Sequence, residues 1–194
     1  MNKNALTTGI AVIIFFFIMI ASVMYGKKIP IDTNNYENCK YEGEITEGSI
    51  YVLGDYTYTY IKIPDDKEEI YGWQIKLTDK NATKIENNNF CKMIDSRPII
   101  STEEMYKDSN LETIDVSNLY TNDVKYMNSM FANSKATKII GLEKLNTSNT
   151  LDMFSMFSDS NFEELNLSNF DTSKVVSMQE MFLGCQTKKI DVSK

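Results

Sequence analysis

The sequence contains no histidine, and it has only three cysteines and three prolines among its 194 residues. The absence of histidine excludes the Ser-His-Asp and Cys-His pairs of nucleophilic enzymes and removes the commonest zinc ligand. None of the eight glycines lies in a phosphate-cradling motif. Adjacent carboxylates such as Glu103 and Glu104 fall in expected loops or turns, where solvation explains them. We therefore predict a protein that is not an enzyme, with no cofactor, no metal and no small-molecule substrate.

Basic residues are also fewer than acidic residues. The chain has 20 Lys and Arg against 27 Asp and Glu, which gives a formal net charge of −7 at pH 7 and an isoelectric point near 4.7. Nucleic-acid binding depends on clustered cations that neutralise phosphates. The composition therefore predicts that nucleic acid is not a partner.

Charge is missing altogether from Asn4 to Gly26, a stretch that is almost wholly apolar from Ile10 to Met24. As a helix this stretch would be about 34 Å long, enough to cross a bilayer core. A cleaved signal peptide needs small residues before its cleavage site, and Ala21 with Ser22 matches that need poorly. We therefore predict an uncleaved signal-anchor helix in residues 1–28. The membrane is then a partner, and the chain crosses the cell membrane once with its repeats outside the cell. The alternative is that the signal is cleaved and the protein is secreted.

Residues 29–48 are polar and acid-rich, which predicts a stalk, and residues 49–97 are expected to form a small β-rich cap. In the cap, two alternating segments flank Gly54 and Asp55, a pair that suits a two-residue hairpin turn. A third alternating strand follows at residues 72–77. Stacked repeats expose an apolar end, which such a β-meander would cover. The alternative is an exposed aromatic ladder that grips a partner, formed by Tyr56, Tyr58 and Tyr60.

From residue 98 onward the chain has a period near 25 residues. An apolar pair recurs in it: Met105-Tyr106, Met130-Phe131, Met156-Phe157 and Met181-Phe182. Such a period indicates repeated units that each cover the apolar face of a neighbour. We predict a half-repeat at 98–109, repeats at 110–134, 135–160 and 161–185, and a partial repeat at 186–194. The Met and Phe side chains, with Met105, are the expected structural core of the repeats.

Each unit changes its period in the middle. The first half alternates apolar with polar residues, as a half-buried strand does. The aligned strand positions are Ile114, Ile140, Leu165 and Ile190. The second half carries apolar residues at i, i+3, i+6 and i+7, the stripe of a short amphipathic helix. The residues at or just before the expected helix starts are Pro98, Asn122, Ser148 and Ser173, which suit those positions. The predicted fold class is an α+β repeat solenoid, with a transmembrane helix and a β-meander cap.

The third unit resembles the repeat of BspA-like leucine-rich-repeat surface proteins of bacteria. The matching residues run from Leu165 to Val175 as LNLSNFDTSKV, followed by Met178-x-x-Met-Phe-x-Gly-Cys185. Residues 134–145 are similar to a second variant of that repeat, although Thr150 stands where valine is usual and this unit is one residue longer. The resemblance covers residues 98–194. It implies an open right-handed solenoid on a bacterial surface, associated with adhesion and with binding of host or matrix proteins, and it carries over no catalytic residues.

We accordingly predict adhesion or protein–protein interaction, with a host or matrix protein as the partner. Exposed positions beside the strands would make the contact, such as Asn118, Glu143 and Asn169. One alternative is a structural stalk or truncated gene product without its own activity, because the chain stops after a strand. A more remote alternative is a glycan-acting enzyme with a repeat appendage.

Two of the three cysteines, Cys39 and Cys91, flank the expected cap. In an oxidising environment they could form a disulfide; if Cys39 lies in a mobile stalk, both stay thiols. Cys185 occupies a repeat position that is Ser109, Ser134 or Ser160 in the other units, so we expect it to be a small packed residue.

Overall fold

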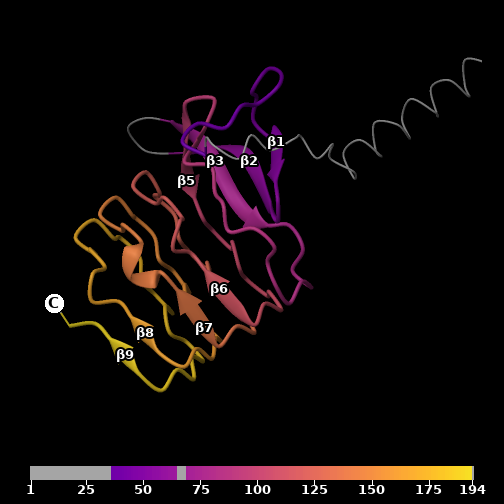
Figure 1. Ribbon diagram of the computed structural model, residues 1–194. Coiled ribbons are helices and arrows are strands. Elements are labelled where there is room, and N and C mark those ends of the chain that lie inside the picture. Colours follow the sequence, from indigo (N-terminus) through magenta and orange to yellow (C-terminus); the bar gives the residue numbers. More distant parts are fainter. Residues whose placement is uncertain (1–35, 65–68, 194) are drawn as a thin grey trace, which may run out of the picture. The chain divides into compact units, whose positions relative to one another are not determined.

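The computed structural model describes residues 36–64 and 69–193 (Figure 1). In these two ranges the regular elements are nine strands and one short 3-10 helix, and neither range contains an α-helix. The predicted α+β solenoid is therefore wrong. The regular structure is nearly all β, and the second half of each unit is built from turns.

Left-handed residues explain why the expected helices do not form. In the first unit Ser129 and Asn133 have φ values of 54° and 51°, a conformation that an α-helix cannot contain. The segment instead makes successive tight turns, in which, for example, the Met130 N–H donates to the Met127 carbonyl at 3.2 Å. We call these segments ribbons. The ribbons span residues 101–109, 126–134, 152–160 and 177–185.

The predicted membrane helix in residues 1–28 lies outside the described residues. Throughout 36–64 and 69–193, no helix is long and apolar enough to cross a membrane. We therefore correct the membrane predictions. The signal anchor, the membrane as a partner and the single-pass location in the cell membrane gain no support from the structure and are withdrawn.

A five-stranded sheet precedes the repeats, in the order β1-β2-β3-β5-β4. Its antiparallel part consists of β1 (Ile50–Leu53), β2 (Tyr56–Ile63) and β3 (Ile70–Leu77). β5 (Arg97–Ser101) then pairs in parallel with β3 and antiparallel with β4 (Met93–Ile94). Pro98, which we expected to start a helix, therefore lies in a strand.

The hairpin turn falls at Gly54 and Asp55, as the sequence pattern predicts, because Leu53 pairs with Tyr56. The tyrosines of β2 point into the core. Tyr56 and Tyr58 are fully buried and Tyr60 is 8% exposed. The alternative of an exposed tyrosine ladder is therefore wrong, and these rings stabilise the sheet.

The described part of the predicted acidic stalk, residues 36–48, packs against this sheet. The Cys39 N–H donates to the Met93 carbonyl at 2.9 Å, and the Asp95 N–H donates to the Cys39 carbonyl at 2.9 Å. Cys39 is disulfide-bonded to Cys91. This segment therefore belongs to the folded domain.

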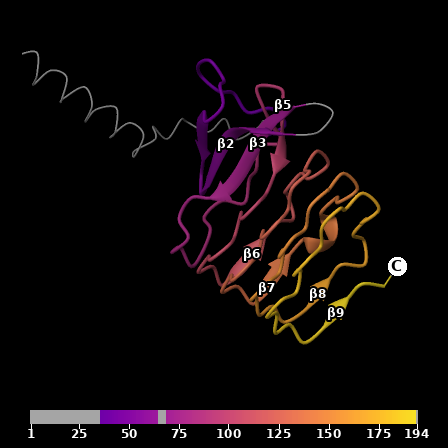
Figure 2. The same ribbon diagram turned by 180° about the vertical axis from the view of Figure 1, so that it is seen from behind.

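The repeats stack with their strands in parallel (Figures 1 and 2). β6 (Thr113–Asp115) pairs with β7 (Lys138–Ile140), and β8 (Leu165–Asn166) pairs with β9 (Ile190–Asp191). A second line of parallel bridges joins the ribbons at Ser101, Tyr126, Asp152 and Ser177. The ribbon bridges thus join every pair of successive units, whereas strand pairing joins the first unit to the second and the third to the partial fourth.

The extra residue of the second unit lies at Gly141, directly after β7. Ile114 pairs with Ile139 and not with Ile140, which corrects the alignment drawn from the sequence. Gly141 has φ +81°, and a Cβ there would lie 2.4 Å from the Ser117 Cα. Glycine is therefore required at this position, where the chain turns into the 3-10 helix η1 (Leu142–Lys144).

Candidate functional site

The recurring Met-Phe pairs form the centre of the stack. Met105, Met130, Phe131, Met156 and Phe157 are fully buried, Met181 is 8% exposed, and Phe182 is partly buried. One aromatic ring from each ribbon stacks on the next, with centroid distances of 5.8, 5.3 and 5.8 Å and planes within 7° of parallel. The column consists of Tyr106, Phe131, Phe157 and Phe182. It fixes the spacing and register of the units.

Most hydrogen bonds between ribbons run in one direction; the opposite direction occurs at ribbon ends, where the Lys135 and Gln186 N–H groups donate to the Ser109 and Ser160 carbonyls. In each of the first three ribbons, four alternate N–H groups donate to four carbonyls of the next ribbon at 2.7–3.1 Å. The second ribbon is typical: its Met127, Ser129, Phe131 and Asn133 donate to Asp152, Phe154, Met156 and Ser158. A ribbon therefore has a carbonyl edge facing the preceding ribbon and an N–H edge facing the following one. An ordinary β-strand differs, because both groups alternate along each of its edges.

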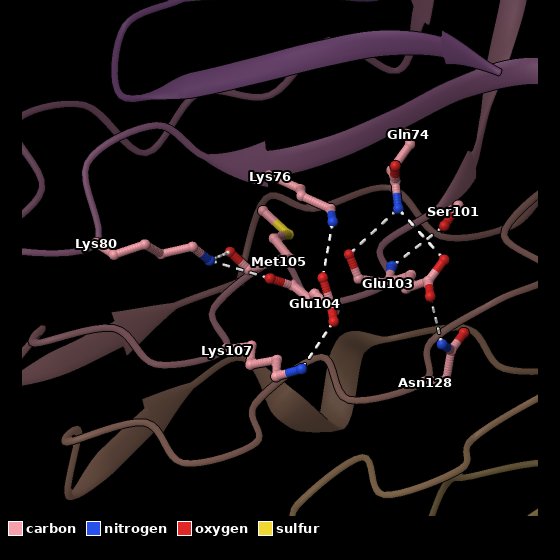
Figure 3. Close-up of polar contacts among 9 residues, drawn as sticks. All are labelled: Gln74, Lys76, Lys80, Ser101, Glu103, Glu104, Met105, Lys107 and Asn128. Atoms are coloured by element: carbon pink, nitrogen blue, oxygen red, sulfur yellow. Dashed lines mark hydrogen bonds and ion pairs between the residues drawn. The ribbon is translucent and has the colours of Figure 1, made fainter.

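The carbonyl edge of the first ribbon is covered by donors from β3 and the loop after it (Figure 3). The Met105 carbonyl accepts from the Leu77 N–H at 3.0 Å and from the Lys80 Nζ at 2.7 Å. The Gln74 Nε2 donates to the Glu103 carbonyl at 3.4 Å. These residues take the place of a preceding ribbon, so the five-stranded sheet caps this end of the stack.

Charges surround this capped end. The Glu104 carboxylate pairs with Lys107 at 2.8 Å and with Lys76 at 3.0 Å. Hydrogen bonds from Lys107 and then Lys76 lower the pKa of Glu104 to about 2. Burial lowers the pKa of Lys80 to about 8, and the nearby charge of Lys76 adds to that effect. The cluster is satisfied internally, which identifies it as a structural cap.

The N–H edge of the last ribbon has the opposite character. By the register of the other ribbons, its donors are the N–H groups of Met178, Glu180, Phe182 and Gly184. Across the described residues, none of these four groups donates a hydrogen bond. The described stack thus ends in a row of donors, and the face of the Phe182 ring that points away from Phe157 has no ring stacked on it.

The last ribbon, the residue before it and the segment after it carry exposed apolar side chains. We call this group the end face, and it consists of Val176, Met178, Leu183, Ile190 and Val192. Val176 is 87% exposed, Val192 68% and Leu183 57%. The equivalent of Val176 in the first unit is Lys125, a charged residue. Apolar groups that lie together at a surface mark interaction sites more often than single exposed residues do.

The contact positions predicted from sequence do not form one site. Asn118, Glu143 and Asn169 are all exposed, one in each unit. However, the Asn118 side-chain amide donates to the Asn88 carbonyl at 3.4 Å, and that of Asn169 donates to the Glu143 carbonyl. Two of the three therefore tie neighbouring turns together. The end face was missed, although the apolar pair Val175-Val176 could have indicated it.

The described residues offer no metal centre, since no group of three or more Cys, Asp and Glu side chains there is placed to hold an ion. A shallow hollow of about 340 Å³ lies between residues 83–88 and β6. Lys84, Glu112 and Asp115 line it together with uncharged groups. Because the lining carries both positive and negative charges, it does not indicate whether a ligand would be an anion or a cation.

Comparison with known proteins identifies a family. The model of a family described as "Mycoplasma protein of unknown function, DUF285" matches residues 72–194. Neither the curated proteins nor the solved structures contain a match. The matched region begins within β3, so it includes the capping residues Gln74, Leu77 and Lys80 together with every ribbon.

Proposed function

The chain belongs to the family of Mycoplasma proteins of unknown function, DUF285, and from this premise we propose that its stacked units serve protein–protein interaction or adhesion. The observation that carries the proposal is the end face. Five apolar side chains are exposed in the last unit, and the last ribbon has four N–H groups with no acceptor among the described residues. Binding of a protein to such a surface is favourable, because apolar side chains are removed from water and the N–H donors gain acceptors.

We also propose a relation to BspA-like leucine-rich-repeat surface proteins. Its support is the sequence of the third unit, Leu165 to Cys185, and the 25-residue period. The resemblance connects the chain to adhesion and to host or matrix proteins as partners. The structure departs from the expectation drawn from that resemblance, because turns stand where we expected helices.

The disulfide is consistent with a role outside a reducing compartment. Disulfides such as Cys39–Cys91 form and persist in oxidising environments. The cap that this bond secures holds the first ribbon in place, which in turn keeps the later ribbons in register. A rigid stack presents its end face at little entropic cost on binding.

Surface plasmon resonance with the immobilised full chain tests the proposal. The analytes are a panel of purified host and matrix proteins. We expect at least one to bind, and Leu183→Glu to weaken that binding about tenfold or more, because it places a charge in the apolar contact. Ile50→Glu is the matched control: Ile50 is 52% exposed on β1, away from the end face, and its replacement should leave binding unchanged.

The alternative function is a structural stalk with no binding activity of its own. It is favoured if the whole panel fails to bind. The end face is ruled out as the contact if a partner binds the Leu183→Glu variant and the unmodified chain equally well.

A further inference from the structure

The hollow between residues 83–88 and β6 has walls that hydrogen bonds hold in place. Two N–H groups of the loop 83–88 donate to the Asp55 carboxylate, at 3.0 and 3.3 Å. The Thr83 carbonyl accepts from the Glu112 N–H at 3.1 Å, and a second carbonyl of the loop accepts from the Asn118 side-chain amide at 3.4 Å. The loop is thus tied to the hairpin turn and to both sides of β6. A ligand that enters the hollow therefore has little of the wall to order.

Three charged side chains line this hollow without pairing with one another. Lys84 is basic, and Glu112 and Asp115 are acidic. Among the described residues, the ion pairs involve none of the three. The one hydrogen bond that these carboxylates accept there comes from the Ser117 N–H, which donates to the Asp115 Oδ1 at 2.9 Å. The charges of the hollow are therefore available to a ligand.

An uncharged group of the lining also lacks a partner. The Asn88 side chain lines the hollow, and its Oδ1 is buried and accepts no hydrogen bond in the described part of the chain. A buried acceptor without a donor is unfavourable, and a folded domain has few of them. After rotation of the carboxamide, an N–H group of a ligand in the hollow can supply the missing donor.

The signs of the charges restrict the ligand. An anion alone would face Glu112 and Asp115, and a cation alone would face Lys84, so like charges would repel in both cases. A neutral ligand would displace water from all three charges and offer no opposite charge in return. A ligand with one carboxylate and two cationic groups matches the lining group for group.

The size and the apolar part of the hollow restrict the ligand further. Its volume of about 340 Å³ lies near the lower end of the range for small-molecule sites, about 300–1,000 Å³. Ile85, which is partly buried, is the one purely aliphatic side chain of the lining. It suits a short aliphatic stem that ends in a charge. A free basic amino acid combines this stem with a carboxylate and two cationic groups.

We propose that the hollow binds a free basic amino acid, of which lysine is the simplest example. Lys84 pairs with the ligand's carboxylate, and Glu112 and Asp115 pair with its two cationic groups. The Asn88 Oδ1 accepts from one of these groups, and the aliphatic stem lies against Ile85. The hollow lies beside the first unit, whereas the end face lies on the last, so this site is separate from the surface proposed for protein binding.

An NMR titration of the isotope-labelled full chain with L-lysine tests the proposal. We expect saturable shifts in the amide signals of residues 83–88 and 112–115. Cadaverine keeps the two cationic groups and lacks the carboxylate, and L-leucine lacks the second cationic group. Each should bind at least tenfold more weakly than L-lysine, because each leaves one charge of the hollow without a partner.

Two variants separate the two ends of the ligand. Lys84→Met should weaken L-lysine binding about tenfold and should not weaken cadaverine binding, because cadaverine has no carboxylate. Glu112→Gln should weaken the binding of both compounds. The controls are Lys144→Met and Glu163→Gln, which change exposed residues outside the hollow. Glu163 occupies the position of Glu112 in the third unit, so the two glutamate variants are closely matched.

Asn88→Ala separates binding from folding. It removes a buried acceptor that has no donor in the unliganded protein, so the melting temperature should stay the same or rise. L-lysine binding should nevertheless weaken about threefold or more, because the ligand loses that acceptor. A structural role for Asn88 would instead lower the melting temperature.

Three results overturn the proposal. The first is the absence of saturable shifts with L-lysine, and the second is equal binding of L-lysine, L-leucine and cadaverine. The third is equal L-lysine binding by Lys84→Met and the unmodified chain. Leu183→Glu should bind L-lysine as the unmodified chain does, so failure of this proposal and failure of the end face as a protein contact are distinguishable.

Discussion

The ammonium group of Lys80 donates a hydrogen bond to the backbone carbonyl of Met105 at 2.7 Å, across 25 residues of sequence. It also donates to the Glu104 carbonyl at 3.0 Å. The Lys80 side chain thereby donates to a carbonyl of the first ribbon, whereas the equivalent carbonyls of the later ribbons accept from backbone N–H groups of the preceding ribbon. The cap is therefore sensitive to the charge of one lysine.

We predict that Lys80 titrates near pH 8. Burial lowers its pKa to about 8 from an ordinary value of 10.5, so the folded state releases this proton before the unfolded chain does. The free energy of unfolding attributable to Lys80 therefore rises between about pH 8 and 10.5. Comparing urea unfolding of the unmodified chain with Lys80→Met across this range isolates the effect. A difference between the two that stays constant with pH contradicts the prediction.

Glu104 should control stability at acid pH. Hydrogen bonds from Lys107 and Lys76 lower its pKa from 4.5 to about 2. The stabilisation is present above pH 4.5 and is lost as pH falls from about 4.5 to about 2, because the unfolded chain takes up the proton first. Glu104→Gln should remove this part of the pH dependence, as measured by thermal unfolding at successive pH values. Glu164→Gln is the control, since its pairing with Lys189 at 3.2 Å is exposed.

Phe157→Ala should be among the most destabilising substitutions in the stack. The ring is fully buried between Phe131 and Phe182, and it contacts Phe162 edge-on. Its removal leaves a cavity and interrupts the column, so we expect a loss of about 3–5 kcal/mol in the free energy of unfolding. Phe182→Ala, at the partly buried end of the same column, should cost about 1–2 kcal/mol. Equal losses in the two variants, measured by chemical denaturation, would show that the column is not continuous.

The Cys39–Cys91 disulfide should stabilise the cap. It closes a loop across a sequence separation of 52, and loops of such length contribute about 2–4 kcal/mol when cross-linked. The double variant Cys39→Ala and Cys91→Ala should lose that amount in urea unfolding without reductant, whereas Cys185→Ala should lose much less. Peptide mapping under non-reducing conditions that finds both thiols free would refute the pairing.

The parts of the fold that could be predicted are those with local signals. Gly54 and Asp55 between two alternating segments place a hairpin, because turn chemistry and strand period agree there. The spacing of Met130-Phe131 and Met156-Phe157 likewise places those side chains at equivalent positions, since stacking requires it. Both signals depend on near neighbours or on strict periodicity.

The helices were predicted wrongly because an apolar stripe does not report backbone conformation. Val124, Met127 and Met130 are buried although the backbone that carries them forms turns. An amphipathic helix would bury the same three side chains, so the apolar pattern does not distinguish the two. The contrary signal was the pair of short polar residues four positions apart in the middle ribbons, such as Ser129 and Asn133, which adopt positive φ; the equivalent Glu104 and Glu180 gave no such signal. The capping cluster left no signal at all, because Lys80 bonds to backbone atoms that every residue possesses.

The covalent link between Cys39 and Cys91 has a mechanical consequence for any tension that arrives from the N-terminal side. Such a load passes through the sulfur bridge directly into the chain beside β4, and the intervening strands β1, β2 and β3 carry none of it. Those strands can then keep holding the first ribbon while the molecule is pulled. Reduction of the bridge would reroute the load through the hairpin and let the cap peel away strand by strand.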